Sequence, residues 1–446
     1  MSTASATDVP LRVRRKAVFA ASLGNFIEWF EFTLYGFFAA IIALNFFTFD
    51  GGEPSLVATF AAFGVSFVFR PLGAVVFAHF GDRTGRRTTL SVAVISMSLA
   101  TFAIGVAPSY ETAGVLAPVL LVLARLVQGF SAGGEFGGAT SYMVEYAPKD
   151  RRAFYGSWQF FTQLFAGLCA AGTGAGLAAV LTEADLVEWG WRVPFVLTLP
   201  LGLIGLYLRL KLDETPEFAE SREAPRSEAP GRTPILVALR DHWRSLVTLI
   251  GMMITGTTTI YMMQAFWPAF LVEQVGMRHS DMYGAMAAGI GANLVLIPLW
   301  AVVSDRIGRR KPFLVATPVL LLLVAVPVYW LLLQGEFATT LAGYLLVALA
   351  GSPMMGVLAT AMADSFPTAV RYSGLSLAYS LAVSIFGGFT PLVLSSMVEG
   401  TGDLMSPAYY LMATAVVSVV AAALFREPVP DAETEAEPEP APGRSS

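Results

Sequence analysis

The chain has 446 residues, of which 55% are hydrophobic and only 14% are charged, and its mean hydropathy is +0.63. Soluble domains carry about a quarter charged residues, so this composition excludes a soluble globular protein and indicates a membrane protein. One cysteine excludes an internal disulfide framework, and three scattered histidines offer no metal-ligand cluster, so we expect no metal and no cofactor.

Apolar stretches of about 20 residues, the length that crosses a bilayer, predict twelve membrane spans. Their centres lie near residues 31, 68, 97, 126, 167, 201, 258, 293, 322, 348, 385 and 416. A polar, Pro-rich stretch separates the sixth span from the seventh. The predicted organisation is an all-α membrane protein with a six-helix bundle at 1–212, a central cytoplasmic loop at 213–242, a second six-helix bundle at 243–426 and a disordered acidic, Pro-rich tail at 427–446.

Lysine and arginine predict the orientation. Of the 28 basic residues, 24 fall at the amino terminus, in the even-to-odd connections or in the carboxyl tail. The other four are Arg70, Arg125, Arg192 and Arg278. By the positive-inside rule, both termini are expected in the cytoplasm.

The two predicted halves repeat each other. "GDRTGRR" (81–87) follows the second span and "SDRIGRR" (304–310) follows the eighth. "EYAPKDRRAFYGS" follows the fourth span and "DSFPTAVRYSG" the tenth, and their charged and proline positions align at equal spacing: Glu145, Pro148 and Arg152 with Asp364, Pro367 and Arg371. Two similarly wired bundles related by an axis along the membrane normal are a known plan for secondary transporters.

These motifs carry a resemblance. The Asp-Arg-x-Gly-Arg-Arg loops at 82–87 and 305–310 and the "RLVQG" of the fourth span (125–129) resemble signatures of the major facilitator superfamily. Stretches such as "GNFIEWFEFTLYG" and "FRPLGAVVFAHFGDRTGRR" resemble its metabolite:proton symporter family, which includes carriers for 2-oxoglutarate, citrate, shikimate and proline/betaine. Glu31 stands where that family usually has aspartate.

The first span holds two glutamates within "GNFIEWFEFTLYG" (24–36). Gly24, Glu28, Glu31 and Tyr35 are spaced by four, three and four residues, which places them on one stripe of a helix. Lipid offers nothing to a carboxylate, so this stripe must face protein or water.

Three buried carboxylates (Glu28, Glu31 and Glu135) are predicted to face two buried guanidiniums (Arg70 and Arg125). Because arginine does not deprotonate, one acid is left over, and a surplus carboxyl in a low dielectric is expected to hold a proton near neutral pH. The resemblance implies that Glu31 and Arg125 form the proton-coupling module. Glu28 is the second candidate for carrying the proton, and Glu135, lower on the fourth span, is a further proton-coupling candidate. Buried ion pairs can also serve only helix packing.

Arg70 is predicted to bind the substrate, because a planar fork of donors recognises a carboxylate bidentately. A permanent pair with Glu28 is the alternative, and the two roles can alternate when the acid is protonated. Uncharged polar residues of other spans are further candidates for the substrate cavity or for interhelical hydrogen bonds: Tyr35, Gln159, Gln163, Tyr261, Gln264, Asn293 and Tyr379.

The resemblance implies a gating role for the repeated loops, as a cytoplasmic charge lock that holds the outward-open state. In this reading Asp82 and Glu145 act with Arg86 and Arg152, mirrored in the second half by Asp305, Asp364 and Arg371. The remaining loop positions assigned to the gate are Arg83, Gly85, Arg87, Arg306, Gly308 and Arg309.

The expected function is proton-coupled import of a small organic acid across the inner membrane of a bacterium, by alternating access. The sequence shows no obvious aromatic cage for a quaternary ammonium, although one can assemble from distant helices, so a zwitterionic osmolyte such as proline or glycine betaine is the alternative. Antiport efflux is disfavoured because the fifth span lacks the Gly-Pro-rich motif of antiporters. A non-transporting osmosensor is also disfavoured, because the carboxyl tail has no heptad repeat that could form a coiled coil.

The expected partners are the small-molecule substrate, protons and the lipid bilayer, with no nucleic acid, and the chain is expected to act as a monomer. No nucleophile–base pair or phosphate loop is apparent in the sequence, so no enzyme is expected.

Overall fold

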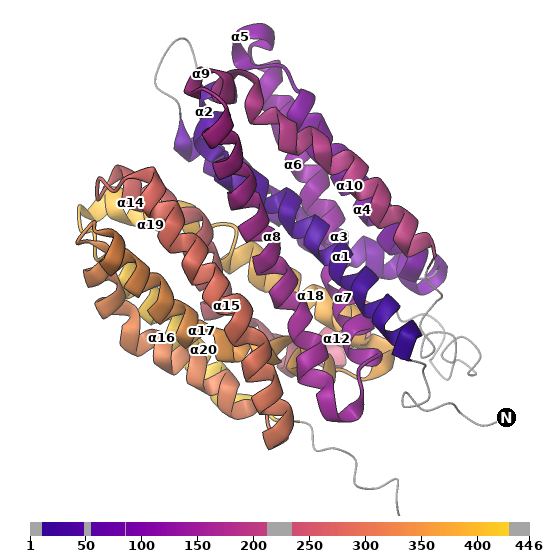
Figure 1. Ribbon diagram of the computed structural model, residues 1–446. Helices are drawn as coiled ribbons and strands as arrows, with labels where there is room; N and C mark the ends of the chain where they lie inside the picture. Colours follow the sequence, from indigo (N-terminus) through magenta and orange to yellow (C-terminus); the bar gives the residue numbers. More distant parts are fainter. Residues whose placement is uncertain (1–10, 49–54, 85, 212–233, 428–446) are drawn as a thin grey trace, which may run out of the picture.

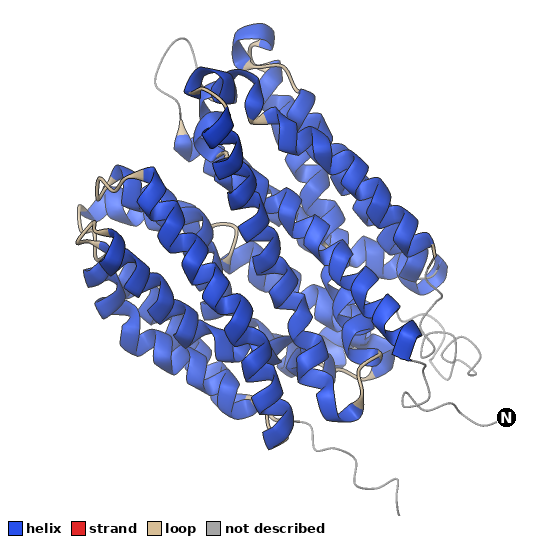
Figure 2. Cartoon of the chain, in the orientation of Figure 1, coloured by secondary structure: helices blue, strands red, loops and turns tan. Residues whose placement is uncertain are grey.

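The computed structural model describes residues 11–48, 55–84, 86–211 and 234–427. Most of this part of the chain is helical, with short loops between the helices, and it contains no strand (Figure 2). In a bilayer an α-helix satisfies all of its own backbone hydrogen bonds, and the long apolar runs of the sequence therefore fold as helices. The predictions for residues 213–233 of the central loop, for Gly85 and for the tail from residue 428 concern residues outside the described part of the chain.

The first half contains the spans predicted from the amino-terminal half of the sequence. Its helices are α1 (Leu11–Phe37), α2 (Ala39–Phe46), α3 (Leu56–Thr84), α4 (Arg86–Val106), α5 (Tyr110–Ala113), α6 (Leu116–Ala132), α7 (Glu135–Glu145), η2 (Lys149–Arg151), α8 (Arg152–Val180), α9 (Glu183–Asp185), η3 (Leu186–Gly190) and α10 (Arg192–Leu210). The fourth span is split into α6 and α7 at Gly133 and Gly134.

The second half follows the short helix α12 (Pro234–Asp241), which lies within the predicted central loop. Its helices are α13 (Trp243–Tyr261), η4 (Met262–Phe266), α14 (Trp267–Glu273), α15 (His279–Ile307), α16 (Lys311–Leu332), α17 (Phe337–Asp364), α18 (Thr368–Phe386), α19 (Thr390–Thr401) and α20 (Ser406–Leu424). The eleventh span is broken between α18 and α19 at "GGF".

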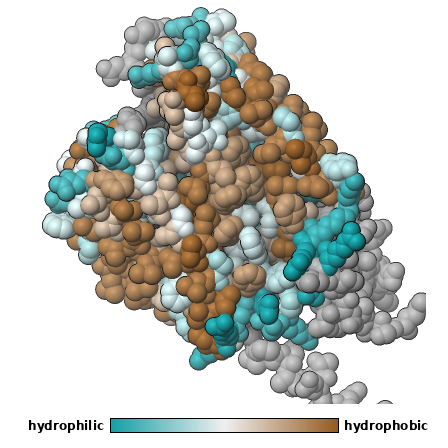
Figure 3. Space-filling view, viewed as in Figure 1, coloured by the Kyte–Doolittle hydropathy of each residue, from teal (hydrophilic) through white to brown (hydrophobic). Residues whose placement is uncertain are grey.

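Twelve spans are confirmed. In the described residues, 11 helical stretches are long and apolar enough to cross a membrane, and the bent pair Arg14–Phe37 and Ala39–Phe46, with an angle of 64° between its parts, supplies the twelfth. The helices of the two halves form two neighbouring bundles (Figure 1). Apolar side chains cover the flanks of the molecule between two more hydrophilic ends (Figure 3). We call the end where α1 begins and α20 ends the terminal end; it is the one that the basic residues predict to be cytoplasmic.

Glycines let helices within the first half approach closely. A Cβ on Gly73 would lie 1.8 Å from the carbonyl oxygen of Phe130, and a Cβ on Gly129 would lie 1.7 Å from that of Ser66. Side chains at these positions would have to push α3 and α6 apart. The close contact fixes the relative positions of Arg70 on α3 and Arg125 on α6.

Candidate functional site

The stripe predicted on the first span faces the interior of the first half. Glu28 and Glu31 are 3% and 0% exposed, and Tyr35 is fully buried. A Cβ on Gly24 would fall 1.7 Å from the Nη2 atom of Arg209, so a side chain at this position would displace that guanidinium. The helical spacing therefore identified the correct face of α1.

Arg70 and Glu28 form a buried ion pair at the centre of the molecule. The Nη2 atom of Arg70 donates to Oε1 of Glu28 at 2.8 Å, and both side chains are almost completely buried. Nε of Arg70 and Oε2 of Glu28 have no hydrogen-bond partner in the described part of the chain. Buried polar atoms are normally paired, so this ion pair retains capacity to bind something else.

Aromatic rings from both halves surround Arg70. Its guanidinium carbon lies 5.1 Å from the ring centroid of Tyr379 in the second half and 5.9 Å from that of Trp29 in the first. The ring of Tyr261, also from the second half, packs 6.4 Å from that of Trp29 and 5.4 Å from that of Phe67. We call Trp29, Phe67, Tyr261 and Tyr379 the central aromatic cluster.

Two polar atoms of this cluster are unpartnered. Within the described residues, neither Nε1 of Trp29 nor the hydroxyl of Tyr261 has a hydrogen-bond partner, although both side chains are buried. Tyr379 accepts a hydrogen bond of 3.4 Å from Gln163 on α8, across the interface between the halves. Arg70, the aromatic rings and these free polar atoms thus converge where the two halves meet.

Glu31 and Arg125, which the resemblance assigns to one proton-coupling module, do not form an ion pair with each other in the described structure. Glu31 instead accepts hydrogen bonds from Ser98 at 2.5 Å and Thr101 at 2.9 Å, both on α4. Gln128 bridges the gap, because it accepts from Nη1 of Arg125 at 2.8 Å and donates to the hydroxyl of Thr101 at 2.6 Å. Two neutral side chains therefore separate the acid from the arginine.

Arg125 lies in an aromatic pocket made within the first half. Its guanidinium carbon is 4.3 Å from the ring centroid of Tyr35 and 5.0 Å from the centroids of Phe32 and Phe63. Its remaining contacts are to neutral oxygens, including Ser66 at 3.0 Å. The Tyr35 hydroxyl donates to the Thr59 carbonyl, so Tyr35 shields Arg125 and does not lie in the central aromatic cluster.

A third buried arginine corrects the charge count. Arg209, at the last turn of α10, is only 4% exposed and forms a bidentate ion pair with Glu135. The prediction of two guanidiniums for three carboxylates is therefore wrong, because Arg209 lies inside the bundle and not in the cytoplasmic connection. Three acids face three arginines, but Glu31 and Arg125 reach each other only through Gln128 and Thr101.

The other predicted polar residues divide between the interface and the interior of each half. Gln159 exchanges hydrogen bonds with Asn25 on α1, a contact within the first half. Asn293 donates to the carbonyl of Gly289 in its own helix, and its Oδ1 atom is unpartnered among the described residues. Gln264 lies across the interface from α8, since a Cβ on Gly167 would be 3.3 Å from its Oε1 atom.

Charged residues at the terminal end pair across the two halves. Arg152 of the first half binds Asp364 of the second at 2.8 Å, and Arg371 of the second binds Glu145 of the first at 3.5 Å. Each of these two ion pairs therefore joins a residue of one repeat to a residue of the other. The reason is that the repeated segments end on opposite sides of the interface, where each acid meets the arginine of the other half.

Asp305 makes a different cross-half contact. Its two carboxylate oxygens accept from the backbone N–H groups of Ala153 and Phe154, each at 2.9 Å, at the first turn of α8. A carboxylate at this place satisfies free N–H groups and complements the helix dipole. Asp305 thus caps a helix of the opposite half, and this cap and the ion pairs join the two halves at the terminal end.

The other predicted gate residues contribute less to the contacts between the halves at the terminal end. Arg306 and Arg309 are exposed, and Gly308 ends α15 in the left-handed conformation with a φ of 72°. Arg310, which the sequence reading passed over, also binds Asp364. Burial beside Arg152 lowers the pKa of Arg310 to about 10. The side chains of Asp82, Arg83, Arg86 and Arg87 lie outside the described part of the structure.

Comparison with known proteins identifies the family. The model of the major facilitator superfamily matches residues 21–322 and 265–445. The chain belongs to the major facilitator superfamily. The transporter is 39% identical over 424 residues to the proline/betaine transporter of Escherichia coli strain K12, covering 93% of this chain and 83% of that protein.

Two other relatives show a range of substrates. The glycine betaine/proline/ectoine/pipecolic acid transporter OusA of Dickeya dadantii is 40% identical over 425 residues, covering 93% of this chain and 83% of that protein. The citrate-proton symporter of Klebsiella pneumoniae is 36% identical over 406 residues, covering 91% of this chain and 90% of that protein. The chain is accordingly a multi-pass membrane transporter of the proton symporter family, and not an enzyme.

The fold has solved counterparts. The structure of the proton:xylose symporter XylE bound to 6-bromo-6-deoxy-D-glucose matches with a TM-score of 0.75 at 16% identity, covering 92% of this chain and 95% of that one. At this identity the match establishes the arrangement of helices. It confirms the predicted major facilitator fold.

Proposed function

We propose that this transporter imports a small zwitterionic osmolyte, of the proline or glycine betaine type, together with protons. The observation that supports this substrate class is the placement of Arg70 beneath aromatic rings of both halves. A guanidinium binds a carboxylate, and nearby aromatic faces bind a substituted ammonium by cation–π attraction. One substrate of this kind would satisfy both groups at once.

Charge balance also favours a zwitterion. Away from the terminal end, the buried carboxylates Glu28, Glu31 and Glu135 are matched by three buried guanidiniums, and a zwitterion leaves that balance unchanged. Each additional carboxylate of a citrate-like substrate would need a further proton or cation in the same low-dielectric interior. The names of the 39% and 40% identical relatives agree with the osmolyte reading, whereas the 36% identical citrate-proton symporter supports the organic acid.

The proton would act through the acids of α1. In the proposed cycle Glu31 takes the coupling proton, because it is buried with only hydroxyl donors and an indirect link to Arg125. Neutralising Glu28 would then free Arg70 from its 2.8 Å ion pair and leave its donors for the substrate carboxylate. Protonation and substrate binding would thereby favour each other.

The cross-half contacts would form the cytoplasmic gate. We assign Arg152, Asp364, Glu145, Arg371 and Asp305 to a lock that holds the terminal end closed while the site opens to the opposite side. A cavity near the opposite end is lined by side chains of α3, α14 and α19, which belong to both halves. Breaking the lock would open the terminal end and release the substrate inward.

An uptake experiment tests this function. The purified protein in liposomes would be given labelled proline, glycine betaine, citrate and 2-oxoglutarate, with and without an inward proton gradient. We expect the gradient to drive accumulation of proline or betaine. Accumulation of the di- and tricarboxylates alone would replace the osmolyte by an organic acid, and accumulation without a gradient would remove proton coupling.

A further inference from the structure

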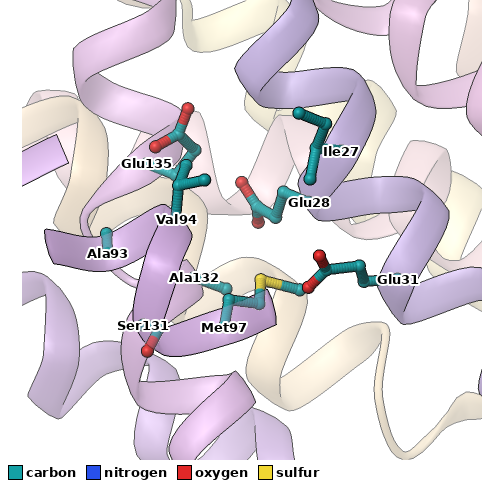
Figure 4. Close-up of a pocket in the computed structure, with 9 residues that line it drawn as sticks. All are labelled: Ile27, Glu28, Glu31, Ala93, Val94, Met97, Ser131, Ala132 and Glu135. Atoms are coloured by element: carbon teal, nitrogen blue, oxygen red, sulfur yellow. The ribbon is translucent and has the colours of Figure 1, made fainter. Parts of the chain in front are cut away.

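A small cavity inside the first half is lined by three buried carboxylates. Glu28 and Glu31 of α1, Ser131 of α6 and Glu135 of α7 surround it together with Val94 and Ala132. In Figure 4 the carboxylate of Glu28 lies between those of Glu31 and Glu135. All of its lining residues belong to the first half, so the cavity is distinct from the central aromatic cluster at the interface.

Two buried polar atoms at this cavity have no protein partner in the described residues. They are Oε2 of Glu28 and the hydroxyl of Ser131, whose side chains are only 3% and 2% exposed. Unpaired buried polar groups are costly, and a polar cavity of this kind holds water when it offers two or more partners and room for a molecule. The free volume here accommodates about one water molecule.

We propose that this cavity holds a water molecule that relays protons from Glu31 through Glu28 to Glu135, inside the first half. The inference rests on the proposed function in that Glu31 is the coupling acid. In each step a carboxylic acid gives its proton to the water, which passes one on to the next carboxylate. One acid becomes a carboxylate as its neighbour becomes an acid, so charge and protons balance.

The charged groups around Glu28 explain how such a relay would serve transport. Arg70 of α3, Glu135 of α7 and Arg209 of α10 act on its charge, together with Glu31 of its own helix. The α4 side of the cavity is apolar, formed by Ala93, Val94 and Met97. When the proton is on Glu28, the ion pair with Arg70 is broken at the substrate site. When it reaches Glu135, it lies beside Arg209 near the terminal end.

The test fills the cavity without removing an acid. Ala132→Val places two methyl groups in the space for water, and Ser131→Ala removes one of its partners. The matched controls are Ala124→Val on the same helix and Ser141→Ala on α7, buried positions that do not line the cavity. The first readout is infrared detection of hydrogen–deuterium exchange at the Glu31 carboxyl, assigned by its loss in Glu31→Gln.

We expect exchange at Glu31 to slow at least tenfold in Ala132→Val and several-fold in Ser131→Ala, with both controls at the wild-type rate. Exchange as fast in the cavity variants as in the controls overturns the relay, and so does a spectrum without a Glu31-dependent carboxyl band. This readout needs no substrate, so it stands even if the osmolyte assignment fails.

The second readout is transport in liposomes. Proton-driven accumulation of the osmolyte should fall about tenfold in Ala132→Val, while exchange of internal for external substrate, which needs no net proton movement, stays within twofold. An equal loss of both activities would mean that the valine disturbs packing, and would also overturn the relay.

Discussion

The interiors of the two halves differ in chemistry although their helices repeat. In the described part of the chain, every buried charged side chain belongs to the first half: Glu28, Glu31, Arg70, Arg125, Glu135, Glu145 and Arg209. The buried polar residues of the second half are serines, threonines and Asn293. The difference suggests a division of labour in which the first half handles protons and the second supplies neutral and aromatic surface for the substrate.

The strongest test of this division is removal of the coupling acid. Glu31→Gln should reduce proton-driven accumulation to background while substrate exchange persists, because a neutral amide resembles the loaded acid but never releases a proton. Uptake and counterflow in liposomes measure the two activities, with the exposed Glu111→Gln as the control. Wild-type accumulation in Glu31→Gln would move the proton site to Glu28.

In the proposed function, Arg70 is the residue of the first half that binds the substrate carboxylate. Arg70→Lys keeps the charge but removes the planar fork. We therefore expect a carboxylate ligand to bind roughly 10- to 100-fold more weakly, a loss of about 1.4–3 kcal/mol of binding free energy. Titration of binding in detergent measures this change. Arg192→Lys is the control, since Arg192 donates to the backbone carbonyls of Gly105 and Ala107 and lies over the ring of Trp191. Unchanged binding in Arg70→Lys would make it a packing residue.

The lock joins the halves, and its two acids should contribute unequally. Asp364 binds Arg152 at 2.8 Å and also binds Arg310, whereas the distance between Glu145 and Arg371 is 3.5 Å. Asp364→Asn should therefore raise the equilibrium constant for opening of the terminal end roughly 5- to 30-fold. This corresponds to about 1–2 kcal/mol less stabilisation of the closed state, a value between those for exposed and buried ion pairs. Glu145→Gln should have the smaller effect.

The opening is measured by the labelling rate of a cysteine introduced as Phe154→Cys, after Cys169→Ser removes the natural thiol. Faster labelling in Glu145→Gln than in Asp364→Asn would reverse the assigned order of the two acids.

The contribution of the second half should be smaller and depend on a ring. Tyr261→Leu should weaken binding of a substituted ammonium roughly 2- to 30-fold, because a cation–π contact contributes about 0.5–2 kcal/mol. Tyr261→Phe keeps the ring and should bind within threefold of wild type. Tyr409→Leu, at a half-exposed position, controls for loss of an aromatic residue elsewhere. If Tyr261→Phe weakens binding by more than threefold, the hydroxyl of Tyr261, and not its ring, makes the contact with the substrate.

Hydropathy and helical spacing predicted the spans and the inward face of α1, because both depend on local sequence. The partners of the buried charges could not be predicted in the same way. Arg209 lies at the end of its span, where a sequence pattern does not distinguish an interior side chain from a cytoplasmic one. Gln128 was visible in "RLVQG", but its bridge to Thr101 depends on how α4 packs beside α6.

The aromatic cluster was also beyond local patterns. Trp29 and Tyr261 lie on different halves, and no spacing in the sequence relates them. Their proximity follows from the way the bundles meet. Helix periodicity selects a face, whereas tertiary packing selects its neighbours.

The crossed lock has a consequence for the origin of the chain. Glu145 and Arg152 of one repeat correspond to Asp364 and Arg371 of the other, and each acid meets the arginine of the opposite repeat. In a twofold-symmetric dimer, residue i of one subunit contacts residue j of the other and the reverse contact also forms. The lock has this reciprocal form. It is the contact that two copies of a single six-helix ancestor would have made with each other before gene duplication and fusion joined them.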